Sequence, residues 1–224
     1  MKHKNLLIFD IDGTLTESVS VHQKTFKAAL IKMGFANFND NWSSYQHHTD
    51  SFIFKTIFEK ETGQVISIAD IEAFEQCLTK LLEDDTAQNP ITEIQGASAF
   101  FHTLCYDHFD IAFATGSLFQ PALLKLMQSG LMIDEALIIA SNKYFSREDV
   151  VGQAIRAAQD HYGTSHYNRI FSFGDGRWDY EAAQNLGLVF IGIGNAELLQ
   201  LGARHYFKDF TDCEVIPLIS NVPV

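Results

Sequence analysis

Four aspartates stand in two short, glycine-containing turns, and each turn follows a run of apolar residues. Asp10 and Asp12 follow residues 6–9, and Asp175 and Asp179 follow residues 170–173. Carboxylates that leave buried strands together are costly unless a proton or a cation lies between them. Carboxylate oxygens suit Mg²⁺, and neither turn contains the His or Cys that zinc prefers. We expect these aspartates to form a magnesium site, although a single Asp in such a turn also serves as an ordinary helix cap.

Two further turns offer groups that bind an anion. Thr115, Gly116 and Ser117 follow an apolar run and precede a predicted helix, so hydroxyls and backbone N–H groups face the same point. Lys143 and Arg147 lie in the turn after the next run and supply positive charge. Each feature alone is also explained by a helix cap or a solvated cation. Together, a metal, an anion cradle and a cation are what a phosphoryl group requires.

The elements that carry these turns alternate between strands and helices. Apolar runs over 6–9, 111–114, 136–139, 170–173 and 188–191 predict strands buried on both faces. Helical patterns over 121–129, 148–162 and 180–186 each end before a glycine. This order predicts an α/β fold with a parallel sheet, whose strands all present their carboxyl ends at one edge.

The segment from 17 to about 89 contains no convincing strand. Helical patterns over 22–33, 52–62 and 69–83 form a block far longer than an ordinary crossover. We predict a core domain formed by 1–16 and 91–224, with a helical cap domain of residues 17–90 inserted after the first strand.

Composition excludes several other classes of protein. The 224 residues are 46% hydrophobic and carry a net charge of −12, which repels nucleic acid. Three separated cysteines argue against a disulfide framework, and no apolar stretch is long enough for a signal peptide or a membrane span. We expect a cytoplasmic protein, as a monomer or homodimer, with no membrane or nucleic-acid partner.

The four turns, in this order, resemble the motifs of the haloacid dehalogenase (HAD) superfamily. Asp10-Ile11-Asp12-Gly13-Thr14 matches the first motif, Thr115 the second, Arg147 or Lys143 the third, and the turn from Gly174 to Asp179 the fourth. The resemblance covers the whole chain and is greatest to members similar to phosphoglycolate phosphatase and β-phosphoglucomutase. It implies a Rossmann-like sheet with a helical cap between the first two motifs.

The resemblance also implies roles for single residues. Asp10 would be the nucleophile that forms an aspartyl-phosphate, and Asp12 the general acid and then the base. Mg²⁺ would be held by Asp10, the backbone carbonyl of Asp12 and Asp175, with Asp179 assisting. Thr115 and Gly116, with Ser117 beside them, would bind phosphate. Arg147 is the first choice for the third-motif cation and Lys143 the second, because Arg147 has the better distance to the following helix.

Substrate choice would depend on the cap, where His22, His48 and Thr49 are candidate contacts. An acid at Asp12 favours phosphoester chemistry over dehalogenation. The sequence therefore predicts a Mg²⁺-dependent phosphatase that hydrolyses a small phosphorylated metabolite. Two alternatives stay open: a phosphomutase, which returns the phosphoryl group to a sugar, and a catalytically idle binding protein on the same fold.

Overall fold

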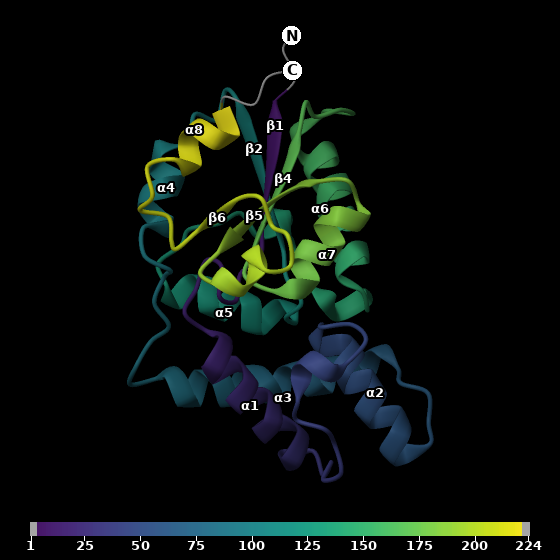
Figure 1. Ribbon diagram of the computed structural model, residues 1–224. Coiled ribbons are helices and arrows are strands. Elements are labelled where there is room, and N and C mark those ends of the chain that lie inside the picture. The colour runs from purple at the N-terminus through teal and green to yellow at the C-terminus, as the bar shows by residue number, and fades with distance from the viewer. Residues whose placement is uncertain (1–3, 221–224) are drawn as a thin grey trace.

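A six-stranded parallel sheet forms the centre of the molecule (Figure 1). The computed structural model describes residues 4–220. The strand order is β3-β2-β1-β4-β5-β6, and every neighbouring pair is parallel. The strands are β1 (Asn5–Phe9), β2 (Phe109–Ala114), β3 (Ile138–Ile139), β4 (Ile170–Gly174), β5 (Val189–Ile193) and β6 (Tyr206–Phe207). The sheet and its flanking helices confirm the predicted α/β class.

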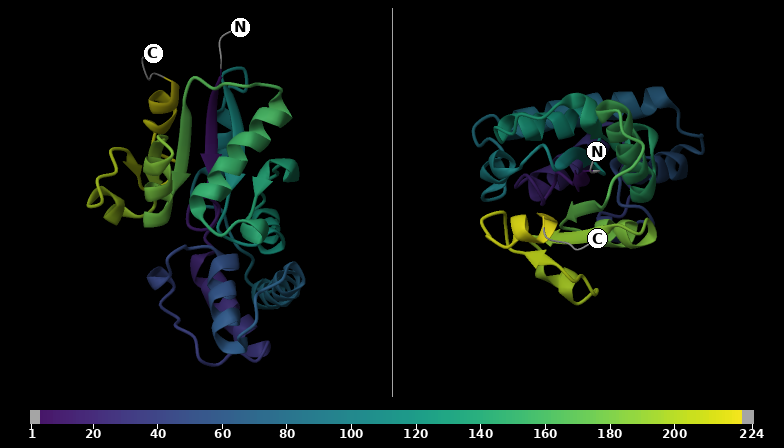
Figure 2. Two further views of the ribbon diagram at one scale, coloured as in Figure 1. Left: turned by 90° about the vertical axis from the view of Figure 1, so that its right-hand side faces the viewer. Right: turned by 90° about the horizontal axis from the view of Figure 1, so that it is seen from above.

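Helices cover both faces of this sheet. Successive side chains of β1 point to opposite faces, and both sets are apolar, so each face must be buried. Leu7 and Phe9 pack into one cluster with residues of α4 (Ala97–Thr103), α5 (Phe119–Gln128) and α8 (Val215–Ser220). Leu6 and Ile8 pack into another with α6 (Arg147–Tyr162), and α7 (Arg177–Asn185) lies beside α6. The views in Figure 2 show these layers on either side of the strands. A strand buried on both faces reads as a continuous apolar run, as residues 6–9 do.

Three of the four α-helices between β1 and β2, called the cap helices below, form a separate block at the carboxyl ends of the strands (Figure 1). They are α1 (Val19–Lys32), α2 (Asp50–Thr62) and α3 (Ile68–Thr86), with a 3₁₀ turn η1 (Trp42–Ser44). This block has its own apolar core, in which the rings of Phe54 and Phe74 stack with centroids 4.1 Å apart. A bridge between Thr16 and Glu93 joins the two connecting segments. The boundaries at 16/17 and 90/91 stay a prediction.

Several short elements differ from the sequence prediction. β6, α4 and α8 were not predicted, because two to seven residues carry too little periodicity to be recognised. Residues 136–137, expected in a strand, belong to the 3₁₀ turn η2 (Glu135–Leu137). Two more 3₁₀ turns, η3 (Ser141–Lys143) and η4 (Ala196–Leu199), follow β3 and β5. None of these differences moves the strand ends that carry the aspartates.

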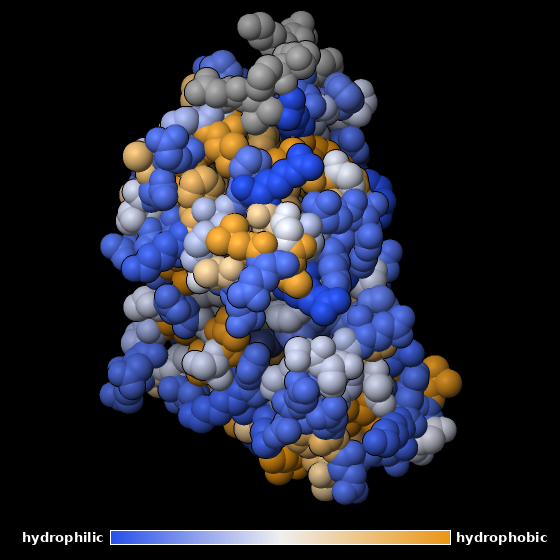
Figure 3. Space-filling view, in the orientation of Figure 1, coloured by the Kyte–Doolittle hydropathy of each residue, from blue (hydrophilic) through white to orange (hydrophobic). Residues whose placement is uncertain are grey.

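The face of the molecule in Figure 3 is mostly hydrophilic, with apolar residues in scattered patches. Single exposed apolar residues are normal on a soluble surface. Across residues 4–220, no helix has the length and apolar character that crossing a bilayer requires.

Candidate active site

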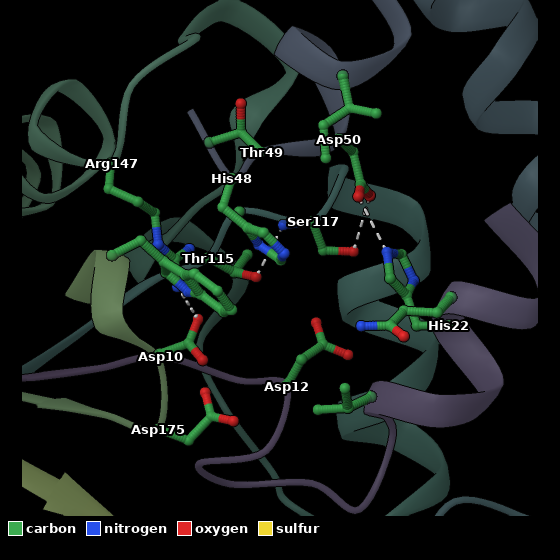
Figure 4. Close-up of a pocket in the computed structure, with 15 residues that line it drawn as sticks. Asp10, Asp12, His22, His48, Thr49, Asp50, Thr115, Ser117, Arg147 and Asp175 are labelled. Carbon is green, nitrogen blue, oxygen red and sulfur yellow. Dashed lines mark hydrogen bonds and ion pairs between the residues drawn. The ribbon is translucent and has the colours of Figure 1, made fainter. Parts of the chain in front are cut away.

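A cavity of about 90 Å³ lies between the carboxyl edge of the sheet and the cap helices (Figure 4). Two sets of residues enclose it. The core wall consists of Asp10, Asp12, Thr115, Gly116, Ser117, Arg147, Asp175 and Trp178. The cap wall consists of Val19, His22, Gln23, His48, Thr49, Asp50 and Ile53. Residues from all four predicted turns thus share one cavity with the cap.

Arg147 links two carboxylates in the core wall. Its Nη2 donates to Asp10 Oδ1 at 2.6 Å, and its Nε donates to Asp179 Oδ1 at 2.9 Å. All three side chains are about 95% buried. Burial strengthens such charge-assisted contacts, and Arg suits them because its planar fork can bridge two acceptors. The guanidinium atom Nη1 is buried and has no hydrogen-bond partner among the described residues, so one donor is left for a ligand.

Asp10, Asp175 and Asp179 can each place one oxygen within 4.8 Å of the others. Burial, together with the neighbouring carboxylates, raises the pKa of Asp10 to about 7 although Arg147 opposes this. The same two causes raise the pKa of Asp175 well above its usual range. A group of hard oxygen donors that repel one another fits a divalent cation such as Mg²⁺.

Gly13 allows this close approach of the first and fourth turns. Its φ is +78°, and a Cβ atom built on it would lie 2.2 Å from Asp175 Oδ2. Glycine adopts such a backbone at no steric cost, and only glycine leaves room for the carboxylate. Gly13 is therefore required for the close approach of Asp175, in addition to allowing the turn after Asp12.

Asp12 is held by a second buried cation, Lys125 on α5. Lys125 Nζ lies 2.7 Å from Oδ1 and 2.8 Å from Oδ2 of Asp12, and its side chain is fully buried. Ser18 Oγ also donates to Asp12 Oδ1, at 2.5 Å. Burial opposes the charge of Asp12, but Lys125, His22 and Ser18 together outweigh this effect and lower the pKa of Asp12 to about 2. The Asp12 side chain is thus paired with Lys125 and lies outside the three-carboxylate group, so only its backbone carbonyl remains a predicted metal ligand.

The turn after β2 brings Thr115, Gly116 and Ser117 to the cavity. A Cβ on Gly116 would lie 2.7 Å from the carbonyl oxygen of His48 and 2.9 Å from Arg147 Nη1, so this close approach requires glycine. Ser117 Oγ donates to Asp50 Oδ2 at 3.2 Å and accepts from Lys125 Nζ at 3.0 Å. The Ser117 hydroxyl therefore links the cap helices to the core. Gly116 lies beside Arg147 Nη1, the donor that has no partner among the described residues.

Asp50, the first residue of α2, fixes the cap on the core. Its carboxylate accepts hydrogen bonds from Ser117 Oγ and from the backbone N–H of Leu118 at 3.0 Å, and it pairs with His22 Nε2 at 2.9 Å. Its own backbone N–H donates to the carbonyl of Gly116 at 2.8 Å. Burial opposes the charge of Asp50, yet His22, Lys125 and the backbone N–H of Leu118 together outweigh this effect, and the pKa of Asp50 is lowered. His22 thus lines the cavity while it pairs with Asp50, and its buried Nδ1 has no hydrogen-bond partner among the described residues.

His48 from the cap stacks on Trp178 from the fourth turn. Their ring centroids are 3.5 Å apart and the planes differ by 2°. Burial, followed by the charge of Arg147, lowers the pKa of His48 to about 4, so its ring is neutral at neutral pH. Thr49 caps α2 by accepting from the backbone N–H of Phe52, and its hydroxyl donates to the carbonyl of Phe145 at 2.8 Å. Thr49 lines the cavity with its hydroxyl already engaged.

The two candidates for the third-motif cation are placed differently. Arg147 contacts Asp10, whereas Lys143 is exposed and is absent from both walls. Sequence reasoning missed Lys125, Asp50 and Trp178. The burial of Lys125 could have been predicted from the sequence, because helical spacing places it on the same face of α5 as Pro121 and Ala122, which are buried.

Comparison with known proteins identifies the family. The model of haloacid dehalogenase-like hydrolases matches residues 4–187. The chain belongs to this family of hydrolases. The predicted family and enzyme class are therefore confirmed. No curated protein matches the sequence.

Solved structures of this HAD family share the fold at low sequence identity. A HAD hydrolase of family IA, variant 3, from Entamoeba histolytica has a TM-score of 0.69 and 20% identity, covering 98% of both chains. CbbY from Rhodobacter sphaeroides in complex with phosphate has a TM-score of 0.67 and 16% identity, covering 92% of this chain and 95% of its own. A predicted phosphoglycolate phosphatase from Haemophilus somnus has a TM-score of 0.61 and 16% identity, covering 97% and 99%. At these identities the likeness establishes the fold.

Proposed function

We propose that this HAD hydrolase is a Mg²⁺-dependent phosphatase that removes the phosphate of a small phosphorylated metabolite through an aspartyl-phosphate on Asp10. The observation that carries the proposal is the buried Arg147, which binds Asp10 through Nη2 and keeps Nη1 unpartnered beside Gly116. A phosphate at this point would take the free donor and lie next to the Asp10 carboxylate. The phosphate complex of the similar CbbY and the phosphatase description of a second similar structure support the same reading.

In the first step, an oxygen of Asp10 attacks phosphorus while the bond to the leaving oxygen breaks. Arg147 offsets the repulsion between the carboxylate and the phosphate, and Thr115 and Gly116 lie where they can bind a phosphate oxygen. For this step Asp12 must first take up a proton from water, which it passes to the leaving oxygen as it returns to the carboxylate. In the second step, Asp12 takes a proton from the water that attacks the phosphorus, the bond between phosphorus and the Asp10 oxygen breaks, and phosphate leaves with Asp10 restored as a carboxylate. The contact with Lys125 keeps Asp12 as a carboxylate, which suits this second role.

Asp10, Asp175 and the Asp12 backbone carbonyl would hold Mg²⁺, with Asp179 assisting, and the ion would neutralise charge on the phosphate oxygens. Asp179 already pairs with Arg147, so it can fix the position of that side chain relative to the metal site.

The test measures phosphate release from a panel of phosphomonoesters, with Mg²⁺ and with EDTA, for the wild type and two variants. Asp10→Asn should lower release at least about 10³-fold, because it removes the nucleophile. Asp107→Asn is the matched control, since Asp107 is exposed and lies before β2, at the opposite end of the sheet. Full activity of Asp10→Asn, or activity indifferent to EDTA, would contradict the proposal. Isomer formation without phosphate release would assign a phosphomutase instead.

A further inference from the structure

The cap wall forms the part of the cavity that the leaving group must contact. Val19, His22 and Gln23 have helical spacing of three and four residues, so α1 presents them on one face. Ile53 of α2 and His48 complete this surface. Figure 4 shows His22 on the other side of the cavity from Asp10 and Arg147. The phosphate is expected at Thr115, Gly116 and Arg147, so everything beyond the ester oxygen faces α1 and α2.

Both buried cations of the site are already paired with carboxylates. Arg147 contacts Asp10 and Asp179, and Lys125 contacts both oxygens of Asp12. Lys125 is also fully buried behind Asp12 and does not line the cavity. Among the described residues that form the two walls, Arg147 is the only Lys or Arg.

Apart from His22, which pairs with Asp50, the side chains that face the leaving group are neutral or acidic. Gln23, Val19 and Ile53 carry no charge, and the buried ring of His48 is stacked on Trp178. Asp50 stands in the same wall, and its lowered pKa keeps it charged. His22 already engages Asp50 through Nε2. A second anionic group on the substrate would therefore be desolvated beside a carboxylate with no further Lys or Arg to pair with, which is unfavourable.

We infer that the substrate is a small phosphomonoester whose phosphate is its only anionic group, the rest being neutral and polar. The inference rests on the proposed phosphatase function and assigns the choice of substrate to the face of α1 that carries Gln23. A hydroxylated leaving group can hydrogen bond to the Gln23 amide, whereas a carboxylate or a second phosphate meets Asp50 and Asp12.

The first experiment compares esters of matched size, with Mg²⁺ present. One pair is 2-hydroxyethyl phosphate and phosphoglycolate, and the other is glycerol 1-phosphate and 3-phosphoglycerate. In each pair, kcat/KM should be at least about tenfold higher for the ester with the neutral leaving group. Equal values, or a preference for the carboxylates, would overturn the inference and leave the phosphatase function standing. If none of the four esters releases phosphate, the inference fails; if the wider panel is also inert, the proposed function fails with it.

The second experiment places a cation in the cap wall. Gln23→Arg should shift the ratio of kcat/KM for phosphoglycolate over 2-hydroxyethyl phosphate at least about tenfold toward phosphoglycolate. Gln23→Met, which has similar length and no charge, is the matched control and should not shift this ratio toward the carboxylate. The same ratio in both variants would show that the charge of the α1 face does not select the substrate.

Discussion

The two walls of the cavity differ in how they are built. The core wall holds its aspartates just after the ends of β1 and β4, and Arg147 at the start of α6 pairs with Asp10 and fixes its position. The cap wall consists of helix and loop residues that are mostly neutral, and it contacts the core through Asp50 and through the stack of His48 on Trp178. Rigid strands suit chemistry, which needs precise placement, while a wall on separate helices can vary with the substrate. The comparison predicts that damage to the core wall costs more than damage to the cap wall.

The largest effect after loss of the nucleophile should follow from Arg147→Met. The change leaves Asp10 and Asp179 buried without their cation, so we expect destabilisation of about 3–5 kcal/mol. Activity should fall at least about 10³-fold, because the donor for the phosphate is lost as well. Urea unfolding and kcat/KM measure the two effects. Arg147→Lys keeps the charge and should recover part of the stability. A stable and active Arg147→Met variant would contradict the prediction that damage to the core wall costs more than damage to the cap wall.

Lys125→Met should have a smaller effect, because Asp12 lines the cavity and can be solvated when its partner is lost. We expect destabilisation of about 1–3 kcal/mol and a fall in kcat of up to about 10²-fold with little change in KM, since Asp12 loses the contact that orients it. Lys80→Met is the control, because Lys80 is 61% exposed and pairs only with surface acids. A change in KM alone would place Lys125 in substrate binding instead.

The contact between the walls should be weaker still. Trp178→Ala and His48→Ala each remove the stacked pair, and a double-mutant cycle should give a coupling energy of about 0.5–1.5 kcal/mol. The corresponding loss of kcat/KM is about tenfold or less. Additive single effects would show that the two rings are neighbours without energetic coupling.

The smallest expected effect is a pH dependence of stability from His48. Its pKa is about 4 in the folded chain and about 6.5 when unfolded, so the unfolded state binds more protons between these values and stability falls as pH falls. This contributes about 0.7 kcal/mol between pH 7 and pH 6. Urea unfolding at the two pH values should show that His48→Gln removes this contribution. An unchanged difference between the two pH values would mean that His48 does not titrate in this way.

Local pattern was enough to predict much of the core. Three of the apolar runs, 6–9, 111–114 and 170–173, end at an aspartate or threonine turn. Parallel strands must present those turns at one edge, so Asp10, Asp175 and Thr115 could be expected together. The same argument left Arg147 and Lys143 open, because both precede the same helix. The fold separates them: Arg147 is the first residue of α6 and is buried against Asp10, whereas Lys143 lies in η3 and is exposed.

The sequence by itself determined the strand order along the chain, the turns that carry the acids and the family to which the chain belongs. These follow from local pattern, since apolar runs, glycines and acids act through neighbours in the chain. Only the tertiary structure decided that Lys125 pairs with Asp12, that Asp50 joins the cap to Ser117, and that His48 meets Trp178. Each of these contacts joins residues from different elements, and their burial together is what makes the charges and rings interact strongly.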